Sequence, residues 1–351
     1  MTDLLDRLGM TVPVVQAPMA GVSTPEMAAA VSNAGGLGSI SVGAVGPEEG
    51  RAAIQAVRAA TNRAFLVNVF CHAPARADAE REAAWIERLR PLFASVGGEP
   101  PAQLREIYRT FVNDDAMLAM LLAERPAVVS FHFGLPPQDR IDALKAAGIT
   151  LFATATSLDE ARHVEAAGCD AIVAQGYEAG GHRGVFDPDV PDPALPTASL
   201  VRMLAKETRL PVIATGGIMD GAGIAAVMAL GAVAAHLGTA FIACSESCAD
   251  QAYRALVLNP PERTIITRVV SGRPARCIAN AFSLWGEDLP ADAVPAYPIA
   301  YDAGKSLNAA AKASGQFGYG AQWAGQGVAP ARAMPAAELV RTLARELADA
   351  R

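Results

Sequence analysis

The sequence predicts a TIM barrel, in which eight parallel strands alternate with helices, and three observations support this fold class. Eight short apolar runs follow one another along the 351-residue chain. The apolar residues are continuous within these runs, which is typical of strands buried on both faces of a parallel sheet. A helical stretch with clear end signals separates most of the runs. An open, doubly wound sheet is the alternative, but eight units in series with no obvious edge strand favour the barrel.

The expected strands are residues 13–19, 37–42, 65–70, 127–134, 150–156, 171–176, 211–217 and 233–241. The helix signals are clearest after the first strand, where Thr24 is an N-cap residue before Pro25. Gly35 and Gly36 then supply a stop. The later helical stretches at 142–148, 159–168 and 223–231 also end in glycine.

Two stretches interrupt this rhythm. Residues 73–124 are charged, helical and too long for a plain connection, so we expect extra helices over one rim of the barrel. Residues 244–315 also look helical, which predicts a smaller, mostly helical second domain over the C-terminal face. The predicted barrel therefore comprises residues 1–243 and 316–351, and residues 244–315 form the capping domain.

Composition excludes several classes of protein. The net charge of −7 and the lack of a lysine- and arginine-rich block argue against nucleic acid as a partner. Five scattered cysteines in an apolar chain indicate a reduced, intracellular protein. Because no apolar run approaches about 18 residues and the start of the chain lacks a basic leader, we expect a cytoplasmic protein without a membrane span. Cys244 and Cys248 have no further ligands nearby, so no metal site is expected.

The C-terminal ends of barrel strands carry the functional residues. Gly216 and Gly217 follow the seventh expected strand, and Gly238 and Thr239 follow the eighth. Many barrels bind a phosphate at this place through backbone N–H groups and a helix N-terminus, here that of the helix at 220–230. The alternative is that these glycines only make tight turns.

Two amides lie at the ends of other strands. Asn68 and Gln175 end strands three and six inside apolar runs, and a buried amide without partners costs about 1–3 kcal/mol. Each amide offers a donor and an acceptor, which suits a heterocycle with mixed edges such as a flavin. Pro18, Met19 and Ala20 would bring apolar backbone close to such a ring. Alternatively, the two amides bond to neighbouring loops.

The loop YEAGGHRGVF, residues 177–186, places His182 among glycines, which let a ligand approach the main chain closely. His182 is therefore either a turn residue or a group aimed at that ligand. His132, at the end of the fourth strand, either faces the same pocket or is a satisfied core histidine. Arg183 is expected to orient the loop.

Five motifs, in this order and spacing, resemble the nitronate monooxygenase family, formerly called 2-nitropropane dioxygenases: QAPMAGVSTPEMAAAVSNAGGLGSI, SFHFGLP, QGYEAGGHRG, ATGGI and HLGTAF. A further stretch, AYPIAYDAGKSL at 296–307, resembles the tyrosine- and lysine-bearing motif of the class I enzymes. The resemblance covers almost the whole chain. It implies an FMN-dependent TIM-barrel enzyme that oxidises nitronates with O₂ to a carbonyl compound and nitrite or nitrate.

Carried over residue by residue, the resemblance implies that FMN is held by Pro18, Met19, Ala20, Asn68, Gln175, Gly180, Gly181, Gly216, Gly217, His236, Leu237, Gly238 and Thr239. It implies that His182 is the active-site histidine. It also implies a pocket for a small carboxylated nitronate, propionate 3-nitronate, formed by Tyr108, Tyr253, Tyr297, Tyr301 and Lys305, with His132 as a further candidate. His236 departs from the family, because relatives often have glutamine before LGT, and this puts its side-chain contact in doubt.

The spacing of four between Tyr297, Tyr301 and Lys305 predicts that they share one face of a helix. No G-x-G-x-x-G motif opens a βαβ unit, which agrees with an enzyme that needs no nicotinamide. The alternatives are an NAD(P)H-dependent quinone reductase or enoyl-thioester reductase on the same barrel, a flavin-free phosphosugar enzyme, and a non-catalytic FMN-binding protein. Whether the protein forms a homodimer is left open.

Overall fold

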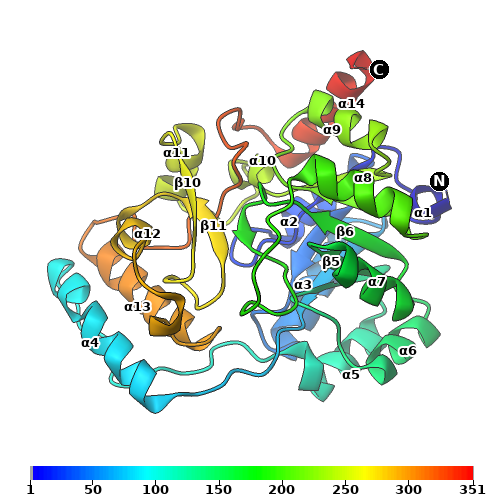
Figure 1. Cartoon of the computed structure of the whole chain (residues 1–351). Helices are drawn as coiled ribbons and strands as arrows, with labels where there is room; N and C mark the ends of the chain where they lie inside the picture. Colours follow the sequence, from blue (N-terminus) through cyan, green and yellow to red (C-terminus); the bar gives the residue numbers. More distant parts are fainter. Residues whose placement is uncertain (1–2, 351) are drawn as a thin grey trace.

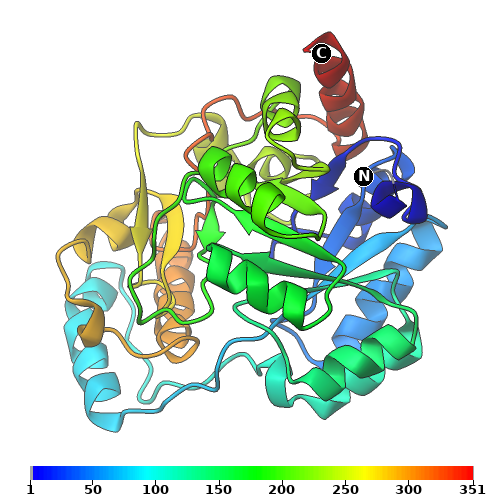
Figure 2. The ribbon, with the colours of Figure 1, turned by 45° about the vertical axis from the view of Figure 1, so that its right-hand side comes forward.

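The computed structural model describes residues 3–350 and contains an eight-stranded parallel barrel (Figures 1 and 2). The strand order is β1-β9-β8-β6-β5-β4-β3-β2. The two outer strands meet through a parallel bridge between Val15 and Leu37, where Gln16 N–H donates to Leu37 O at 2.9 Å. The predicted fold class is therefore confirmed, while residues 1, 2 and 351 of the predicted domain ranges lie outside the described part.

Each barrel strand falls inside one of the expected ranges. The strands are β1 Val14–Gln16, β2 Gly38–Ser41, β3 Phe65–Phe70, β4 Val128–His132, β5 Thr150–Ala155, β6 Ala171–Gln175, β8 Val212–Thr215 and β9 Ala234–Leu237. Nearly all of their residues are buried, because one face of each strand packs inside the barrel and the other packs under the helices. Burial on both faces explains why the apolar runs are continuous.

The helices packed around the barrel are α1 Asp3–Arg7, α2 Pro25–Asn33, α3 Pro47–Ala60, α5 Asp115–Glu124, α6 Gln138–Ala146, α7 Leu158–Ala166, α8 Thr197–Glu207, α9 Gly221–Ala229 and α14 Ala336–Asp349. The start of α2 is as predicted, since the Thr24 side chain accepts from Met27 N–H at 3.0 Å. None of the helices within residues 3–350 is long and apolar enough to cross a membrane.

A second body of structure lies beside the C-terminal face of the barrel (Figure 1). It contains α11 Gln251–Leu258, α12 Ala281–Trp285 and α13 Ile299–Ala313, and also an antiparallel pair, β10 Thr264–Thr267 and β11 Ala275–Ile278. The segment 244–315 is thus helical as expected, with a small sheet in addition. Strand β7, Gly181–His182, comes from the loop after β6 and pairs with β11 as the third strand of this sheet.

The insertion at 73–124 is shared between the two bodies. Helix α5 packs against α3 on the barrel, whereas α4, Ala79–Ser95, packs against α13 (Figures 1 and 2). Trp85, Leu89 and Phe93 of α4 are buried in one cluster with Phe282 and Leu307. Tyr319, Ala321 and Trp323 border the same cluster. We therefore propose that the cap comprises α4 and residues 244–323.

Candidate functional site

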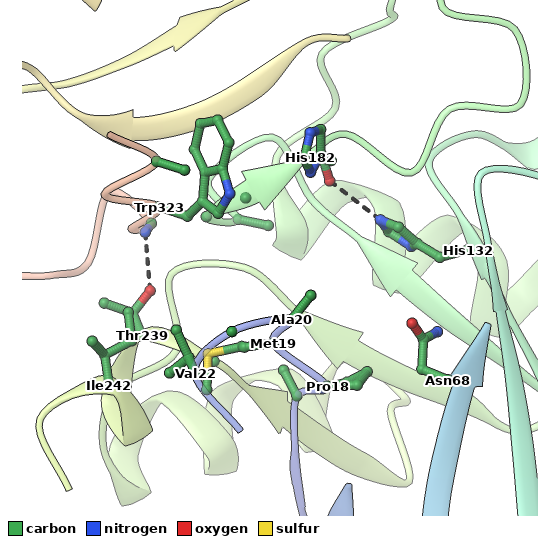
Figure 3. A pocket seen from close by; sticks show the side chains of 18 of the residues that line it. Pro18, Met19, Ala20, Val22, Asn68, His132, His182, Thr239, Ile242 and Trp323 are labelled. Atoms are coloured by element: carbon green, nitrogen blue, oxygen red, sulfur yellow. Dashed lines mark hydrogen bonds between the residues drawn. The ribbon is translucent and has the colours of Figure 1, made fainter. Parts of the chain in front are cut away.

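A cavity of about 650 Å³ lies at the C-terminal ends of the barrel strands. Every residue that the sequence predicted for the site lines it. Figure 3 shows His182 and Trp323 on one side of this cavity, and Pro18, Met19 and Ala20 on the other. The barrel contributes mostly backbone, amides and small residues, and the cap contributes aromatic rings and lysines.

Glycines form one end of the cavity because the main chain itself lines it there. Gly216 and Gly217 have φ angles of 126° and 71°, which side chains rarely tolerate. Gly238 precedes the short helix α10, Thr239–Ile242, and both Gly238 and Thr239 face the cavity. This end offers backbone groups at the glycines themselves, which is what a phosphate site uses, with Ile242 and Met19 beside them.

The expected contribution of the helix at 220–230 to this phosphate site is wrong. The first turn of α9 is already occupied, because Asp220 accepts from Gly223 N–H at 2.8 Å and Glu346 accepts from Gly221 N–H at 3.0 Å. Two carboxylates at this N-terminus repel a phosphate rather than attract it. The helix that begins at the cavity is α10 instead.

The two strand-end amides bond to neighbouring protein groups while lining the cavity. Asn68 Nδ2 donates to the carbonyl and the hydroxyl of Ser130, at 3.1 and 3.0 Å. Gln175 Nε2 donates to the His182 carbonyl at 3.0 Å, and its Oε1 accepts from Gly184 N–H at 2.7 Å. Gln175 therefore fixes both ends of the histidine-bearing stretch.

Arg183 orients the loop, as predicted. Its side chain is 1% exposed and its guanidinium forms two bonds to Asp192, at 2.6 and 3.1 Å. It also donates to the carbonyls of Gln175 and Gly176, at 3.2 and 2.9 Å. One buried side chain thus ties the start of the loop to residues further along it.

The glycines of this loop allow close packing between chain segments. A Cβ on Gly180 would lie 2.5 Å from the carbonyl carbon of Ala324. A Cβ on Gly184 would lie 3.0 Å from Cε1 of His132. Gly181 has a φ of 75°, so it also suits glycine for its backbone conformation. The loop consequently packs closely between the chain at Ala324 and the C-terminal end of β4 at His132.

His182 projects from β7 into a ring of aromatic side chains. Its ring centroid lies 5.1 Å from Trp323, 5.3 Å from Tyr297 and 5.5 Å from Phe133. Its Nε2 contacts the Ser271 hydroxyl at 2.8 Å. Burial, followed by the nearby His132 and Arg273, holds the pKa of His182 well below its ordinary value, so the imidazole is neutral at pH 7.

His132 has protein partners for both ring nitrogens. Its Nδ1 lies 3.0 Å from the Thr154 hydroxyl, and its Nε2 lies 3.4 Å from the His182 carbonyl (Figure 3). Because a carbonyl only accepts, Nε2 carries the hydrogen. Burial lowers the pKa of His132 to about 3. This geometry supports the core-histidine alternative, although the ring also lines the cavity.

His236 ends β9 at the cavity floor. Its side chain is buried, and neither ring nitrogen has a hydrogen-bond partner among residues 3–350. Burial lowers the pKa of His236 to about 4, so the ring is neutral and offers one donor and one acceptor.

The tyrosine and lysine motif converges on His182, but not in the way its spacing predicted. Tyr297 precedes α13, which begins after Pro298, so the prediction of one shared helix face is wrong for Tyr297. Its ring nevertheless lies 6.3 Å from that of Tyr108. The Lys305 ammonium lies 4.9 Å from the ring centroid of Tyr108 and 5.5 Å from that of Tyr301, which is cation–π geometry.

Three residues at the site escaped sequence analysis. Trp323 packs on His182, and its carbonyl accepts from the Tyr253 hydroxyl at 2.5 Å. Ser271 bonds the His182 ring, and Phe133 lies beside it. Only Trp323 carries a signal in the sequence, as an aromatic residue in the glycine-rich run 315–327. The contacts of Ser271 and Phe133 with His182 depend on tertiary structure and leave no such signal.

The protein is of the TIM-barrel class, and the cavity at its C-terminal strand ends is lined by backbone at one end and by aromatic rings and His182 at the other. The profile of the nitronate monooxygenase family matches residues 2–346. The chain is 61% identical over 345 residues to a nitronate monooxygenase of Paraburkholderia phytofirmans, covering 98% of this chain and 94% of that protein. It is 54% identical to a nitronate monooxygenase of Pseudomonas aeruginosa, covering 99% of both. The chain therefore belongs to the nitronate monooxygenase family of oxidoreductases.

Solved structures agree with this assignment. The crystal structure of nitroalkane oxidase from Streptomyces ansochromogenes matches with a TM-score of 0.91 at 40% identity, covering 99% of both chains. FabK from Thermotoga maritima matches with a TM-score of 0.75 at 28% identity, covering 99% of this chain and 96% of that one.

The Arg183–Asp192 pair predicts a pH-dependent contribution to stability. Partial burial alone would raise the pKa of Asp192, but the bonds from Arg183 and Ala194 outweigh it and lower that pKa. A depressed carboxyl pKa stabilises the fold above the unfolded value of about 3.9, and this stabilisation is lost as pH falls through the folded pKa. We expect Asp192→Asn to lower the free energy of unfolding at pH 7 by about 1 kcal/mol or more. Urea unfolding at pH 7 and in acid measures this.

The control for this prediction is Asp189→Asn in the same loop. Asp189 is 87% exposed and lies 3.5 Å from Arg268, so its loss should change stability little. An Asp192→Asn deficit of equal size at both pH values would contradict the assigned charge interaction.

Proposed function

We propose that the protein is an FMN-dependent nitronate monooxygenase that oxidises alkyl nitronates, with propionate 3-nitronate as the preferred substrate. The products are a carbonyl compound and nitrite or nitrate, formed with O₂. The observation that carries this proposal is Lys305, whose exposed side chain lines the same aromatic cavity as His182 and has no carboxylate within salt-bridge distance among residues 3–350. An unpaired ammonium beside a neutral histidine suits a small carboxylated anion.

The residues of the cavity fit FMN. Gly217, Gly238 and Thr239 would hold the phosphate with backbone groups, and a Cβ at Gly238 would press against Ala17 at 3.3 Å. Pro18 and Met19 would pack against the ring. The two unpartnered nitrogens of His236 support the fit, because a buried imidazole without a protein partner is costly unless a ligand completes its bonds.

FMN, when bound, supplies the electron transfer between nitronate and O₂ that no side chain provides. The chain supplies orientation, charge and a place for one proton. Because FMN would carry out the electron transfer, the chain needs to supply an ordered loop and aromatic walls but no strong base.

His182 has one nitrogen available for the substrate. Nε2 is held by Ser271, and Nδ1 has no hydrogen-bond partner within the described chain. A serine hydroxyl both donates and accepts, so Ser271 supports either tautomer. When Ser271 donates to Nε2, Nδ1–H donates to a nitronate oxygen. When Ser271 donates to the Arg273 carbonyl, 3.3 Å away, the Nδ1 lone pair faces the substrate, and it accepts the α-proton of a neutral nitroalkane only if the pKa of His182, which is lowered in this structure, rises toward neutrality in the complex.

The first experiment identifies the cofactor and the reaction together. Denaturing the purified protein should release FMN, and an oxygen electrode should record uptake with propionate 3-nitronate. FAD, or a flavin that stays attached to the chain, would contradict the cofactor assignment. Anaerobic bleaching by NADH or NADPH without nitronate-dependent oxygen uptake would favour the reductase alternative.

The second experiment tests His182. We expect His182→Asn to retain FMN and to lose about 10²–10⁴-fold in turnover. The loss should be greater for neutral nitroalkanes than for nitronates, because only the former must give up a proton. His163→Asn, at an exposed position of α7, is the control. Unchanged rates on both substrates would reduce His182 to a turn residue.

The third experiment tests Lys305. We expect Lys305→Met to raise KM for propionate 3-nitronate about tenfold or more, because a hydrogen bond to a charged group contributes about 1.5–3 kcal/mol. An alkyl nitronate without a carboxylate should be affected much less. Lys206→Met is the control, since Lys206 is exposed on the barrel helix α8 and does not line the cavity. Equal losses on both substrates would assign Lys305 to the fold or the cofactor instead.

A further inference from the structure

Arg273 is a buried cation without an acidic partner. Its side chain is 2% exposed, and among residues 3–350 no carboxylate lies within salt-bridge distance of it. Its guanidinium donates to the carbonyls of Val185 and Arg183, the latter at 3.5 Å. These bonds occupy two of the five guanidinium N–H groups, and neither acceptor carries a negative charge. Buried charges are normally paired, because removing a charge from water is expensive.

The Arg273 guanidinium is separated from the cavity by the ring of Phe133, which lines the cavity wall. The guanidinium carbon of Arg273 is 4.4 Å from the ring centroid of Phe133. That ring is in turn 5.5 Å from His182 and 5.4 Å from Tyr297, and all three rings line the cavity. Burial lowers the pKa of Arg273 to about 10, so it remains charged at neutral pH. Because it is buried, salt screens its field only weakly.

The titratable groups on the cavity side of Arg273 do not offset this charge, and the carboxylates of Glu160 and Asp187 act on it only from beyond salt-bridge distance. Burial, with a contribution from Arg273, lowers the pKa values of His72, His132 and His182, and these three imidazoles are neutral at pH 7. Burial raises the pKa of Tyr297 well above its ordinary value, so its hydroxyl also stays neutral. That hydroxyl has no hydrogen-bond partner within the described residues. On the Phe133 side, the substrate end therefore has neutral groups in front of the fixed positive charge of Arg273, in addition to the Lys305 ammonium on the α13 side.

We infer that Arg273 is a specificity-determining residue that makes the cavity selective for anions through its field, without touching the ligand. This inference rests on the proposed function and deepens it. Lys305 is assigned to the carboxylate of one substrate, whereas Arg273 would favour the negatively charged nitro-type head that all nitronates share. The expected attraction at an effective dielectric constant of about 20 corresponds to about tenfold or more in affinity.

Nitrate is a suitable probe, because it is a planar monoanion without a carboxylate and its binding needs no turnover. Titration calorimetry of the purified holoprotein should give a nitrate Kd about tenfold or more higher in Arg273→Gln than in the wild type. Arg273→Lys retains the charge and should stay within about threefold. Nitroethane, which is neutral, should bind all of these variants alike.

Arg276→Gln is the matched control. Arg276 is also buried and forms no salt bridge within residues 3–350, and its guanidinium lies 5.0 Å from the ring centroid of Tyr177, which, unlike Phe133, does not line the cavity. Nitrate affinity in Arg276→Gln should match the wild type. Arg273→Met, which keeps an apolar contact with Phe133, replaces Arg273→Gln if the latter lacks a wild-type thermal midpoint.

Three results would overturn the inference. One is a nitrate Kd that rises no more in Arg273→Gln than in Arg276→Gln. Another is an equal loss in Arg273→Lys and Arg273→Gln, which would assign the effect to shape. The third is a wild type that does not bind nitrate. Absence of nitronate-dependent oxygen uptake in a wild type that binds nitrate would instead contradict the proposed function alone.

Discussion

The hydrogen bonds of Gln175 and Arg183 clamp the loop between β6 and β8, and the rest of the site depends on this clamp. Gln175 bonds to the His182 carbonyl and the Gly184 amide, and Arg183 bonds back to Gln175 and Gly176 and forward to Asp192. The same residues that Gln175 holds on the barrel side pair with the cap, because Gly181 and His182 form β7 and pair with β11. His182 is thus positioned by both bodies of the protein at once.

This arrangement explains why the loop needs glycine where it does. The chain must pass within van der Waals contact of Ala324 on one side and of the His132 ring on the other, and a Cβ at Gly180 or Gly184 would collide with them. The glycines therefore serve chain-on-chain packing first. The same lack of side chains lets a ligand in the cavity approach the main chain of this loop closely.

The strands and their polar ends could be predicted because the information is local. A strand buried on both faces must be apolar throughout, so residues such as Asn68 and Gln175 stand out in the sequence. The clamp could not be predicted, since it depends on which groups meet after folding. The same limit applies to α4, whose buried Trp85 packs on the cap, and to α9, whose first turn is occupied by Glu346 from the far end of the chain. Tyr297 was assigned to a helix by spacing alone, but the helix begins after Pro298.

The chain is acidic overall, but the charged side chains of Lys305 and Arg273, at and behind the cavity, are basic. The chain has 36 acidic and 29 basic residues, yet Lys305 at the cavity wall and Arg273 behind Phe133 form no salt bridge within residues 3–350. Keeping acids away from them costs stability, and neutral imidazoles and tyrosines fill the space between. A barrel with backbone-lined strand ends is common to many chemistries. The TM-score falls from 0.91 for the nitroalkane oxidase to 0.75 for FabK, although nearly the whole chain is covered in both matches. In the proposed function, substrate choice on this common scaffold rests on the aromatic cap residues and on the positive charges of Lys305 and Arg273.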